Sequence, residues 1–414
     1  MSNNDYYEQD TKFIVGFAGS GKSTKIVELA DKNTLVLVPT HKAADVLIAK
    51  GVENVYTIHA VLKLVPSINE NFKKKMHTTL RQVGKTDLST ITSIIIDEYS
   101  MISLGILDML MAVLPTSCHV TICGDPFQLP PINGEQIEPW EPIEELTTQY
   151  RSKNPKGTKM FMDFMYAIRD RSSPPYTKYR TTEGWVSMFN PDTDRILAFT
   201  NKEVHRLNAI VAKGAELRIG EELVMNGIAC TMIAEPTNYV IYPSCISKGE
   251  LLDGNKLKMA SERASKAIDK WSTNLGMYKT AYVDVDGSQF SIFFDPNHHE
   301  TEKRLKIAVE KAQLLVIRSN SLGSDEDIPT WCRNNRGRTG VRERGKAWAK
   351  YLAHTGYVFS LTRPYATTVH KAQGSEFSKV FINQSDIRKT KHNEQYMRLM
   401  YVSLSRAIDE IIFI

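Results

Sequence analysis

Two short segments contain residue types that can bind and cleave a polyphosphate. The first reads Gly-Phe-Ala-Gly-Ser-Gly-Lys-Ser-Thr over residues 16–24 and directly follows the apolar run 13–15. Its glycines let backbone N–H groups turn inward around phosphate, Lys22 can reach the terminal phosphates, and the Ser23 hydroxyl can ligate Mg²⁺. We therefore expect phosphate contacts from Gly19, Ser20, Gly21, Lys22, Ser23 and Thr24.

The second segment is Ile-Ile-Ile-Asp-Glu at residues 94–98. A short β-branched run bounded by polar residues is typical of a buried parallel strand, and ligands of open α/β sheets bind at the carboxyl ends of such strands. Asp97 could hold the Mg²⁺ that Ser23 shares, and Glu98 could orient and deprotonate a water. Alone this pattern more often marks a strand entering an acidic turn. Paired with the first segment, it indicates hydrolysis of a nucleoside triphosphate.

The elements that must position these groups alternate along the chain. Strands are predicted at 13–15, 35–38, 94–96 and 120–123, and helices at 22–30, 42–50 and 103–114. This alternation predicts a parallel, doubly wound α/β sheet, interrupted by a polar insert at 60–88. A second α/β unit should begin after residue 151, with strands at 195–200, 357–361, 380–382 and 411–414. Between its parts, residues 215–355 are irregular and rich in β-like pieces.

Composition bounds the class of protein. The 414 residues suggest two to four domains, and 42% hydrophobic with 24% charged residues is typical of a globular protein. The polar start predicts no signal peptide, and no apolar run is long enough for a transmembrane helix. Five cysteines without CxxC pairing suit a reducing compartment, so we expect a cytoplasmic protein, in the host cytoplasm if phage-encoded. Basic clusters at 73–85 and 333–350 suit a polyanionic partner, although charge runs are often only solvated faces.

Six further segments, taken in order, resemble the motifs of superfamily 1 DNA helicases. The resemblance is nearest to the RecD-like branch and its Dda-type phage members, and it runs from about residue 13 to the C-terminus, loosely over 215–355. The segments are Val-Pro-Thr-His-Lys-Ala-Ala (38–44), Thr-Ile-His (57–59), Gly-Asp-Pro-Phe-Gln-Leu-Pro-Pro (124–131), Leu-Thr-Thr-Gln-Tyr-Arg-Ser (146–152), Val-His-Lys-Ala-Gln-Gly-Ser-Glu-Phe (369–377) and Tyr-Val-Ser-Leu-Ser-Arg-Ala (401–407).

The resemblance implies an α/β fold with two RecA-like parallel-sheet cores. The first core would be residues 1–150, with the insert 60–88 as a pin. The second would combine 151–214 with 356–414. Residues 215–355 would form a β-rich, small-barrel-like accessory domain inserted in the second core, and ATP would lie between the cores with Mg²⁺.

The same resemblance adds residues to the nucleotide site. Gln128 follows a β-run, where its amide can bond γ-phosphate or the attacking water. Arg151 and Arg406 match the family's arginine fingers, whose permanent charge can stabilise the transferring phosphoryl group. Tyr150 matches a tyrosine that stacks on adenine, although a buried core tyrosine is the alternative. Glu376 matches a position that accepts a hydrogen bond from ribose.

The nucleic-acid track implied by the motifs uses small polar groups that bond phosphates without reading bases. Helix N-capping explains some of the threonines equally well. Pro66 matches a proline of Dda-type proteins, and Phe72 in the insert could be a strand-separating pin or merely an exposed hydrophobic residue. The remaining DNA-binding residues implied are Thr40, His41, Thr57, His59, Thr367, Thr368, His370 and Lys371.

The resemblance therefore implies a monomeric ATP-dependent DNA helicase that moves 5′-to-3′ on single-stranded DNA. Its partners would be single-stranded and forked duplex DNA, with single-strand-binding or replication proteins as further candidates. The family usually carries an upstream glutamine that reads adenine, and here Gln9 lies too close to the loop, so selectivity for ATP stays open. Two alternatives also stay open: an RNA helicase or protein-displacing translocase, and a nucleotide-switched nucleic-acid-binding module.

Overall fold

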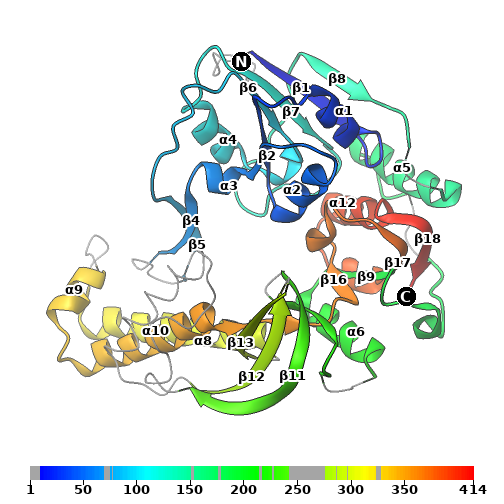
Figure 1. Ribbon diagram of the computed structural model, residues 1–414. Coiled ribbons are helices and arrows are strands. Elements are labelled where there is room, and N and C mark those ends of the chain that lie inside the picture. The colour runs from blue at the N-terminus through cyan, green and yellow to red at the C-terminus, as the bar shows by residue number, and fades with distance from the viewer. Residues whose placement is uncertain are drawn as a thin grey trace. The chain divides into compact units, whose positions relative to one another are not determined.

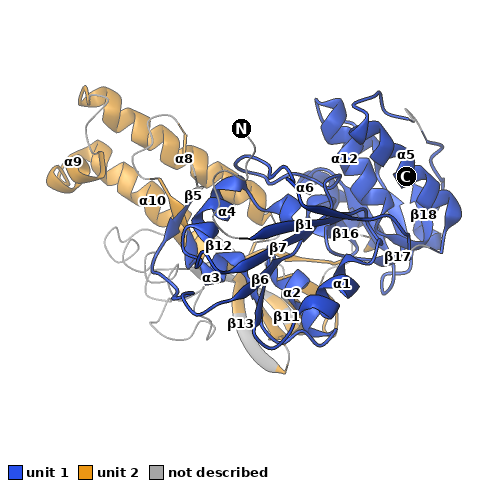
Figure 2. Ribbon diagram, turned by 90° about the horizontal axis from the view of Figure 1, so that it is seen from above, with its two compact units in different colours: residues 1–65, 80–211, 365–414 blue, residues 66–79, 212–364 orange. Residues whose placement is uncertain are grey.

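The computed structural model describes residues 10–69, 75–76, 78–150, 153–175, 179–213, 217–225, 228–241, 276–285, 287–295, 297–322 and 328–414. The chain forms two compact units (Figure 2), with residues 1–65, 80–211 and 365–414 in the first and 66–79 and 212–364 in the second. Arg151 and Phe72, both implicated by the sequence, lie outside the described residues. Within the described ranges, no helix combines the length and apolar character needed to cross a membrane.

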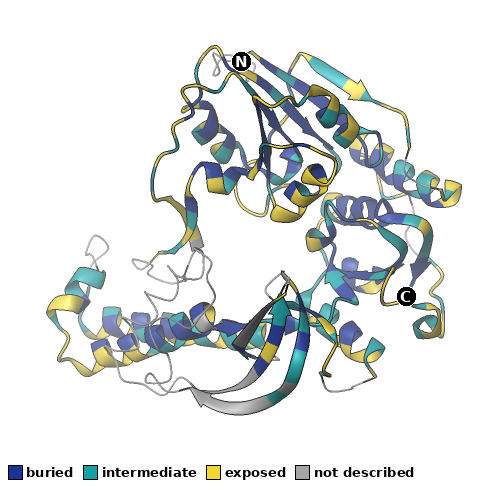
Figure 3. Cartoon of the chain, in the orientation of Figure 1, coloured by how far each residue is buried: buried dark blue, intermediate teal, exposed yellow. Residues whose placement is uncertain are grey.

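A six-stranded parallel sheet in the first unit has the order β3-β2-β6-β7-β1-β8 (Figure 1). Alternate residues of its strands enter two separate apolar clusters: Phe13 and Val15 join one, and Ile14 joins the other. Both faces are therefore covered, as the dark strands of Figure 3 show, which explains the unbroken apolar runs in the sequence. The strands are β1 (Thr11–Gly16), β2 (Thr34–Val38), β3 (Val55–Thr57), β6 (Ser93–Ile96), β7 (His119–Gly124) and β8 (Ile143–Leu146). The helices between them are α1 (Lys22–Leu29), α2 (His41–Ile48), α3 (Ile58–Val61), the 3₁₀ turn Tyr99–Met101 and α4 (Leu104–Met111).

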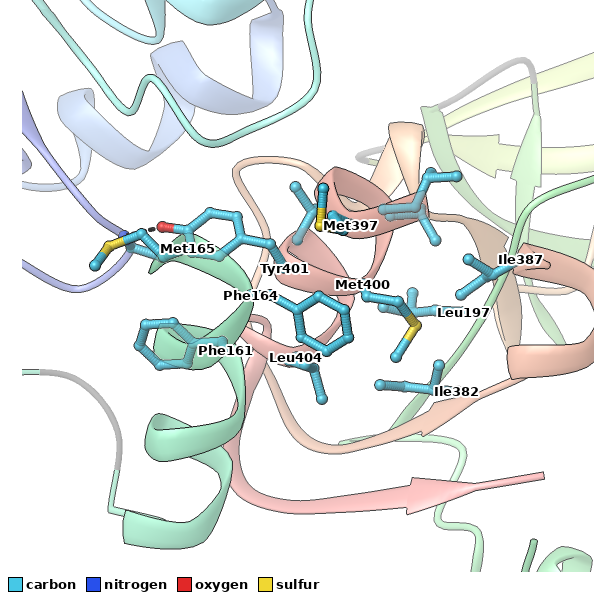
Figure 4. Close-up of a cluster of buried hydrophobic side chains, with 14 of the residues drawn as sticks. Phe161, Phe164, Met165, Leu197, Ile382, Ile387, Met397, Met400, Tyr401 and Leu404 are labelled. Carbon is cyan, nitrogen blue, oxygen red and sulfur yellow. Dashed lines mark hydrogen bonds between the residues drawn. The ribbon is translucent and has the colours of Figure 1, made fainter. Parts of the chain in front are cut away.

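A second parallel sheet in the same unit has the order β16-β9-β17-β18. Its strands are β16 (Ala366–Thr368), β9 (Arg195–Ala198), β17 (Phe377–Ile382) and β18 (Ala407–Phe413). Helices α5 (Pro155–Arg169) and α12 (Asn393–Leu404) pack together on one face, where Phe164, Met400 and Leu404 are buried with Leu197 and Ile382 (Figure 4). The other helices are α6 (Asn201–Val211), α11 (Gln384–Ile387) and the 3₁₀ turns Trp185–Met188 and His370–Ala372. The prediction of an α/β fold with two parallel sheets is confirmed.

The second unit contains a largely antiparallel sheet of order β14-β13-β12-β11-β10-β15. Its first and last strands are separated in the chain by Ser360 alone, so the sheet must curl until its two edges meet. The prediction of a core strand at 357–361 is wrong: these residues pair with β13 and β10 instead. The strands are β10 (Glu222–Met225), β11 (Ile228–Ile241), β12 (Gly276–Val285), β13 (Ser288–Phe294), β14 (Val358–Phe359) and β15 (Leu361–Thr362).

In the described part of this segment, three helices lie between β13 and β14, so the predicted β-rich accessory segment is mixed α and β. They are α8 (His298–Ser319), α9 (Ile328–Asn334) and α10 (Thr339–Tyr357). Buried Arg344 of α10 donates to Gln313 of α8, and the rings of His298 and His354 stack 4.4 Å apart. The basic run 333–350 therefore lies mainly on helix α10.

The insert after the first core's third strand forms a two-stranded sheet of β4 (Leu64–Ile68) and β5 (Thr78–Gln82). Met76, beyond β4, is buried with Val309, Trp348 and Tyr351 of the α8 and α10 helices. Its backbone N–H donates to Glu310 at 2.9 Å. These contacts lie within the second unit, to which residues 66–79 of the insert belong.

Candidate nucleotide and nucleic-acid site

The loop between β1 and α1 has the geometry of a phosphate cradle. Gly19 and Gly21 have φ of 82° and 92°, which L side chains rarely adopt. A Cβ at Gly16 would come within 2.3 Å of the Ser20 hydroxyl, so a side chain there would collide with the loop. The Lys22 ammonium donates to the carbonyls of Gly16 at 2.7 Å and Phe17 at 3.0 Å. These bonds hold the lysine inside the loop, at the start of helix α1.

Asp97 and Glu98 follow β6 at the carboxyl edge of the first sheet. Burial, together with the charge of Glu98, raises the pKa of Asp97 to about 7. The Glu98 N–H donates to Asp97 Oδ1 at 2.8 Å. Glu98 itself has φ of 52°, which is uncommon for a residue with a side chain, and its buried Oε2 has no hydrogen-bond partner. Strained and unsatisfied polar groups of this kind gather at functional sites.

One cavity of about 380 Å³ in the first unit is bordered by residues from both parallel sheets. All the residues predicted from the sequence to bind or hydrolyse the nucleotide line this cavity, except Arg151, which lies outside the described residues. The roles of these residues stay predictions. The predicted members that line the cavity are Gly19, Ser20, Gly21, Lys22, Ser23, Thr24, Asp97, Glu98, Gln128, Tyr150, Glu376 and Arg406.

Tyr150 is 75% exposed, so its alternative as a buried core tyrosine is wrong. Its backbone N–H donates to Gly19 O at 2.9 Å, and its ring lies 3.5 Å from where a Cβ on Gly21 would be. The preceding Gln149 donates its side-chain amide to Ala18 O at 2.9 Å. An open aromatic face beside the phosphate loop suits stacking by a base.

Arg406 has a different environment, because it is only 2% exposed. Its guanidinium donates to the Ser405 hydroxyl at 2.9 Å and to the carbonyls of Val402 at 3.2 Å and Ser375 at 3.3 Å. Arg406 thus borders the cavity with donors already bonded to protein.

Sequence reasoning missed a polar network beside Gln128. Tyr401 of α12 donates its hydroxyl to Asp125 Oδ2 at 2.7 Å and accepts from the Ala18 N–H at 3.0 Å. Arg398, one turn earlier, donates to the carbonyls of Pro126 at 2.7 Å and Gln128 at 2.8 Å. Asp125 and Tyr401 stand inside motifs quoted above, but nothing in the sequence pairs them.

The predicted DNA-contacting residues lie mostly where strands end. Thr40 caps α2 and Thr57 caps α3, each accepting from a backbone N–H, at 3.2 Å and 3.3 Å. Thr368 accepts likewise from the Lys371 N–H at 3.3 Å. Thr40 and Thr57 are therefore N-caps, whereas Thr368 stands one residue before Val369, the N-cap of the 3₁₀ turn His370–Ala372. His41 and Lys371 are exposed, His59, Thr367 and His370 are half-buried, and Pro66 is an exposed residue of β4.

Comparisons with known proteins match both ends of the chain. A family model described as an AAA domain matches residues 3–134, and the UvrD-like helicase C-terminal domain matches residues 364–414. The ATP-dependent DNA helicase dda of Enterobacteria phage T4 is 23% identical over 97% of this chain and 93% of its own. The ATP-dependent DNA helicase Pif1 of Campylobacter jejuni is 24% identical over 96% of this chain and 87% of its own.

Among solved structures, the Bacteroides Pif1 helicase in complex with ADP-AlF3 and single-stranded DNA matches with a TM-score of 0.46 and 17% identity. That match covers 99% of this chain and 90% of the other. The family models and the two relatives together confirm that this chain resembles the superfamily 1 DNA helicases of the Dda and Pif1 type.

Proposed function

We propose that this protein is an ATP-dependent DNA helicase that moves 5′-to-3′ on single-stranded DNA and separates duplexes. The observation that carries the proposal is the cavity lined by charged residues that follow strands or helices of both α/β cores. Lys22 and Glu98 belong to the first core, and Arg406 belongs to the second. The two relatives that span nearly the whole chain are both ATP-dependent DNA helicases. The direction of movement rests on the resemblance alone.

ATP would occupy this cavity with its phosphates on the loop 16–24 and its base against Tyr150, while Glu376 bonds the ribose. The donor set fits a hard divalent cation, because the carboxylates of Asp97 and Glu98 and the hydroxyl of Ser23 line the same cavity. Ser23 and Asp97 would hold Mg²⁺, which would neutralise phosphate charge. Asp97 is buried, and its pKa stays raised although the charges of Lys22 and Lys50 lower it, which supports that assignment.

Hydrolysis would use three further groups. Glu98 accepts the proton of the attacking water through its unpartnered carboxylate oxygen. Gln128 orients the water or the γ-phosphate, and Arg406, with Arg151, stabilises charge on the transferring phosphoryl group. Because these groups come from both sheets, bound ATP favours a closed cleft and hydrolysis releases it.

The domain assignment follows from the same reading. We assign residues 1–150, with 60–88 as the pin, to the first motor core and the pair 151–214 and 356–414 to the second, except that β14 and β15 belong with 215–355 to the accessory domain. Single-stranded DNA would cross the carboxyl edges of both sheets, contacting His41, Lys371 and the capping threonines through phosphates. Phe72 in the pin would meet the last base pair.

An ATPase assay with competing nucleic acids tests this proposal. We expect hydrolysis to be weak alone and strongly stimulated by single-stranded DNA, with RNA of the same length much less effective. Stimulation by RNA instead would favour an RNA helicase. Tight ATP and DNA binding without stimulated turnover would favour the nucleotide-switched binding module.

A further inference from the structure

Tyr401 places one hydroxyl between two segments of the nucleotide site. The residue is fully buried on helix α12 (Figure 4). Its hydroxyl accepts a hydrogen bond from the backbone N–H of Ala18 in the phosphate loop. The same hydroxyl donates to Asp125, three residues before Gln128. Two predicted parts of the site, the loops that follow the neighbouring parallel strands β1 and β7, therefore share one atom of helix α12.

The Asp125 carboxylate has little freedom to compensate. Asp125 is fully buried, its Oδ1 accepts from the Phe127 N–H at 3.0 Å, and its Oδ2 accepts from Tyr401. The Gln128 amide lies 3.5 Å from that same Oδ2, a long contact that leaves Tyr401 as the closer donor. Without the hydroxyl, one carboxylate oxygen would lose its short bond in a dry environment.

Helix α12 contacts the loop that contains Asp125 and Gln128 at a second point, and the helix then ends beside Arg406. Arg398, three residues before Tyr401, donates to the carbonyls of Pro126 and Gln128. The helix ends at Leu404, two residues before Arg406. The Arg406 guanidinium donates a hydrogen bond to the carbonyl of Val402 in the last turn of the helix. Helix α12 therefore contacts the phosphate loop, the loop that contains Gln128, and Arg406, and it fixes their positions relative to one another.

We propose that Tyr401 is a positioning residue for ATP hydrolysis: its hydroxyl holds the phosphate loop and the Gln128 loop in register with Arg406. The proposal rests on the proposed function. Gln128 and Arg406, which the hydroxyl holds in register with the loop, would act on the γ-phosphate, whereas the α- and β-phosphates would be bound by the backbone of the loop itself. Loss of the hydroxyl should therefore weaken binding of the transition state more than binding of ADP.

Tyr401→Phe tests this, because it removes only the hydroxyl and keeps the ring, which packs against Phe127 and Phe161. Tyr396→Phe is the matched control: Tyr396 is buried on the same helix, and its hydroxyl accepts from Gln384 at 3.0 Å, away from Asp125. The measurements are DNA-stimulated kcat and the Kd of ADP and of ADP with aluminium fluoride. For Tyr401→Phe we expect kcat and aluminium fluoride affinity to fall about 10- to 100-fold, with ADP affinity within about twofold. Tyr396→Phe should match wild type in all three.

Equal loss of ADP and aluminium fluoride affinity in Tyr401→Phe would overturn the proposal, because the hydroxyl would then only maintain the loop. Wild-type values would overturn it also. Asp125→Asn provides a second test that does not depend on folding of the tyrosine variant, and it should show the same selective loss. The double variant should lose no more than either single one, since both remove one contact; additive losses would contradict the shared role. Failure of the proposed function itself is distinct, because wild type would then show no DNA-stimulated turnover.

Discussion

Glu98→Gln should separate binding from hydrolysis. The substitution keeps the shape of the side chain but removes the carboxylate that would accept a proton from water. A positioned general base contributes about 10²–10⁴-fold, or about 2.7–5.4 kcal/mol of activation free energy. We expect DNA-stimulated kcat to fall by that factor, because the buried Oε2 of Glu98 has no hydrogen-bond partner that already occupies it. Affinities for ATP and for single-stranded DNA should stay within about twofold of wild type.

The same variant should not be less stable than wild type. The Glu98 charge raises the pKa of Asp97, which means that the two carboxylates repel each other in the folded protein. Removing one charge relieves that repulsion, so the thermal midpoint should be unchanged or higher. Glu28→Gln, on the exposed face of α1, is the matched control and should keep full kcat. Near-normal turnover in Glu98→Gln, or its loss together with ATP binding, would refute the assignment of the base.

Four other outcomes are expected. Arg406→Ala should lower kcat by roughly 10³-fold with the fold retained by circular dichroism; full activity would remove Arg406 from the chemistry. Binding should favour single strands, with little sequence preference, and weaken steeply as salt rises in fluorescence titrations; salt-resistant, sequence-specific duplex binding would contradict the phosphate track. Phe72→Ala should impair duplex separation more than DNA-stimulated ATPase, and equal loss of both would exclude a pin. Burial, with the nearby His354, lowers the pKa of His298 to about 4. As pH falls below about 6.5, the unfolded chain therefore takes up this proton before the folded protein does, and folding is destabilised. The thermal midpoint should drop between pH 7 and pH 4, and His298→Gln should make it less dependent on pH.

The sequence predicted the first sheet well because its signals are local. The four strands that were predicted are short apolar runs, and 13–15, 94–96 and 120–123 lead directly into Gly16, Asp97 and Gly124, whereas β3 and β8 were not predicted. The residues 357–361 were misassigned because an apolar run does not state its pairing partner. Val358 pairs with Phe293 and Leu361 with Met225, both far away in the chain.

Residues of the nucleotide site could likewise be predicted only where the signal is local in the sequence. Lys22, Asp97 and Glu98 could be found because each stands beside its own strand or loop. The bond from Tyr401 to Asp125 joins residues 276 positions apart, and no spacing rule reaches that far. Likewise, Arg406 was recognised by its motif, but only the structure reveals that it is buried and bonded to Ser375 and Ser405.

Unwinding of tailed duplexes tests the central claim most directly. Matched DNA duplexes with a 5′ or a 3′ single-stranded tail would be incubated with the protein and ATP, and strand release followed over time. We expect release from the 5′-tailed duplex and little from the 3′-tailed one, dependent on ATP and abolished in Lys22→Ala. Release from neither duplex, with DNA-stimulated ATP hydrolysis intact, would contradict a helicase and leave a translocase.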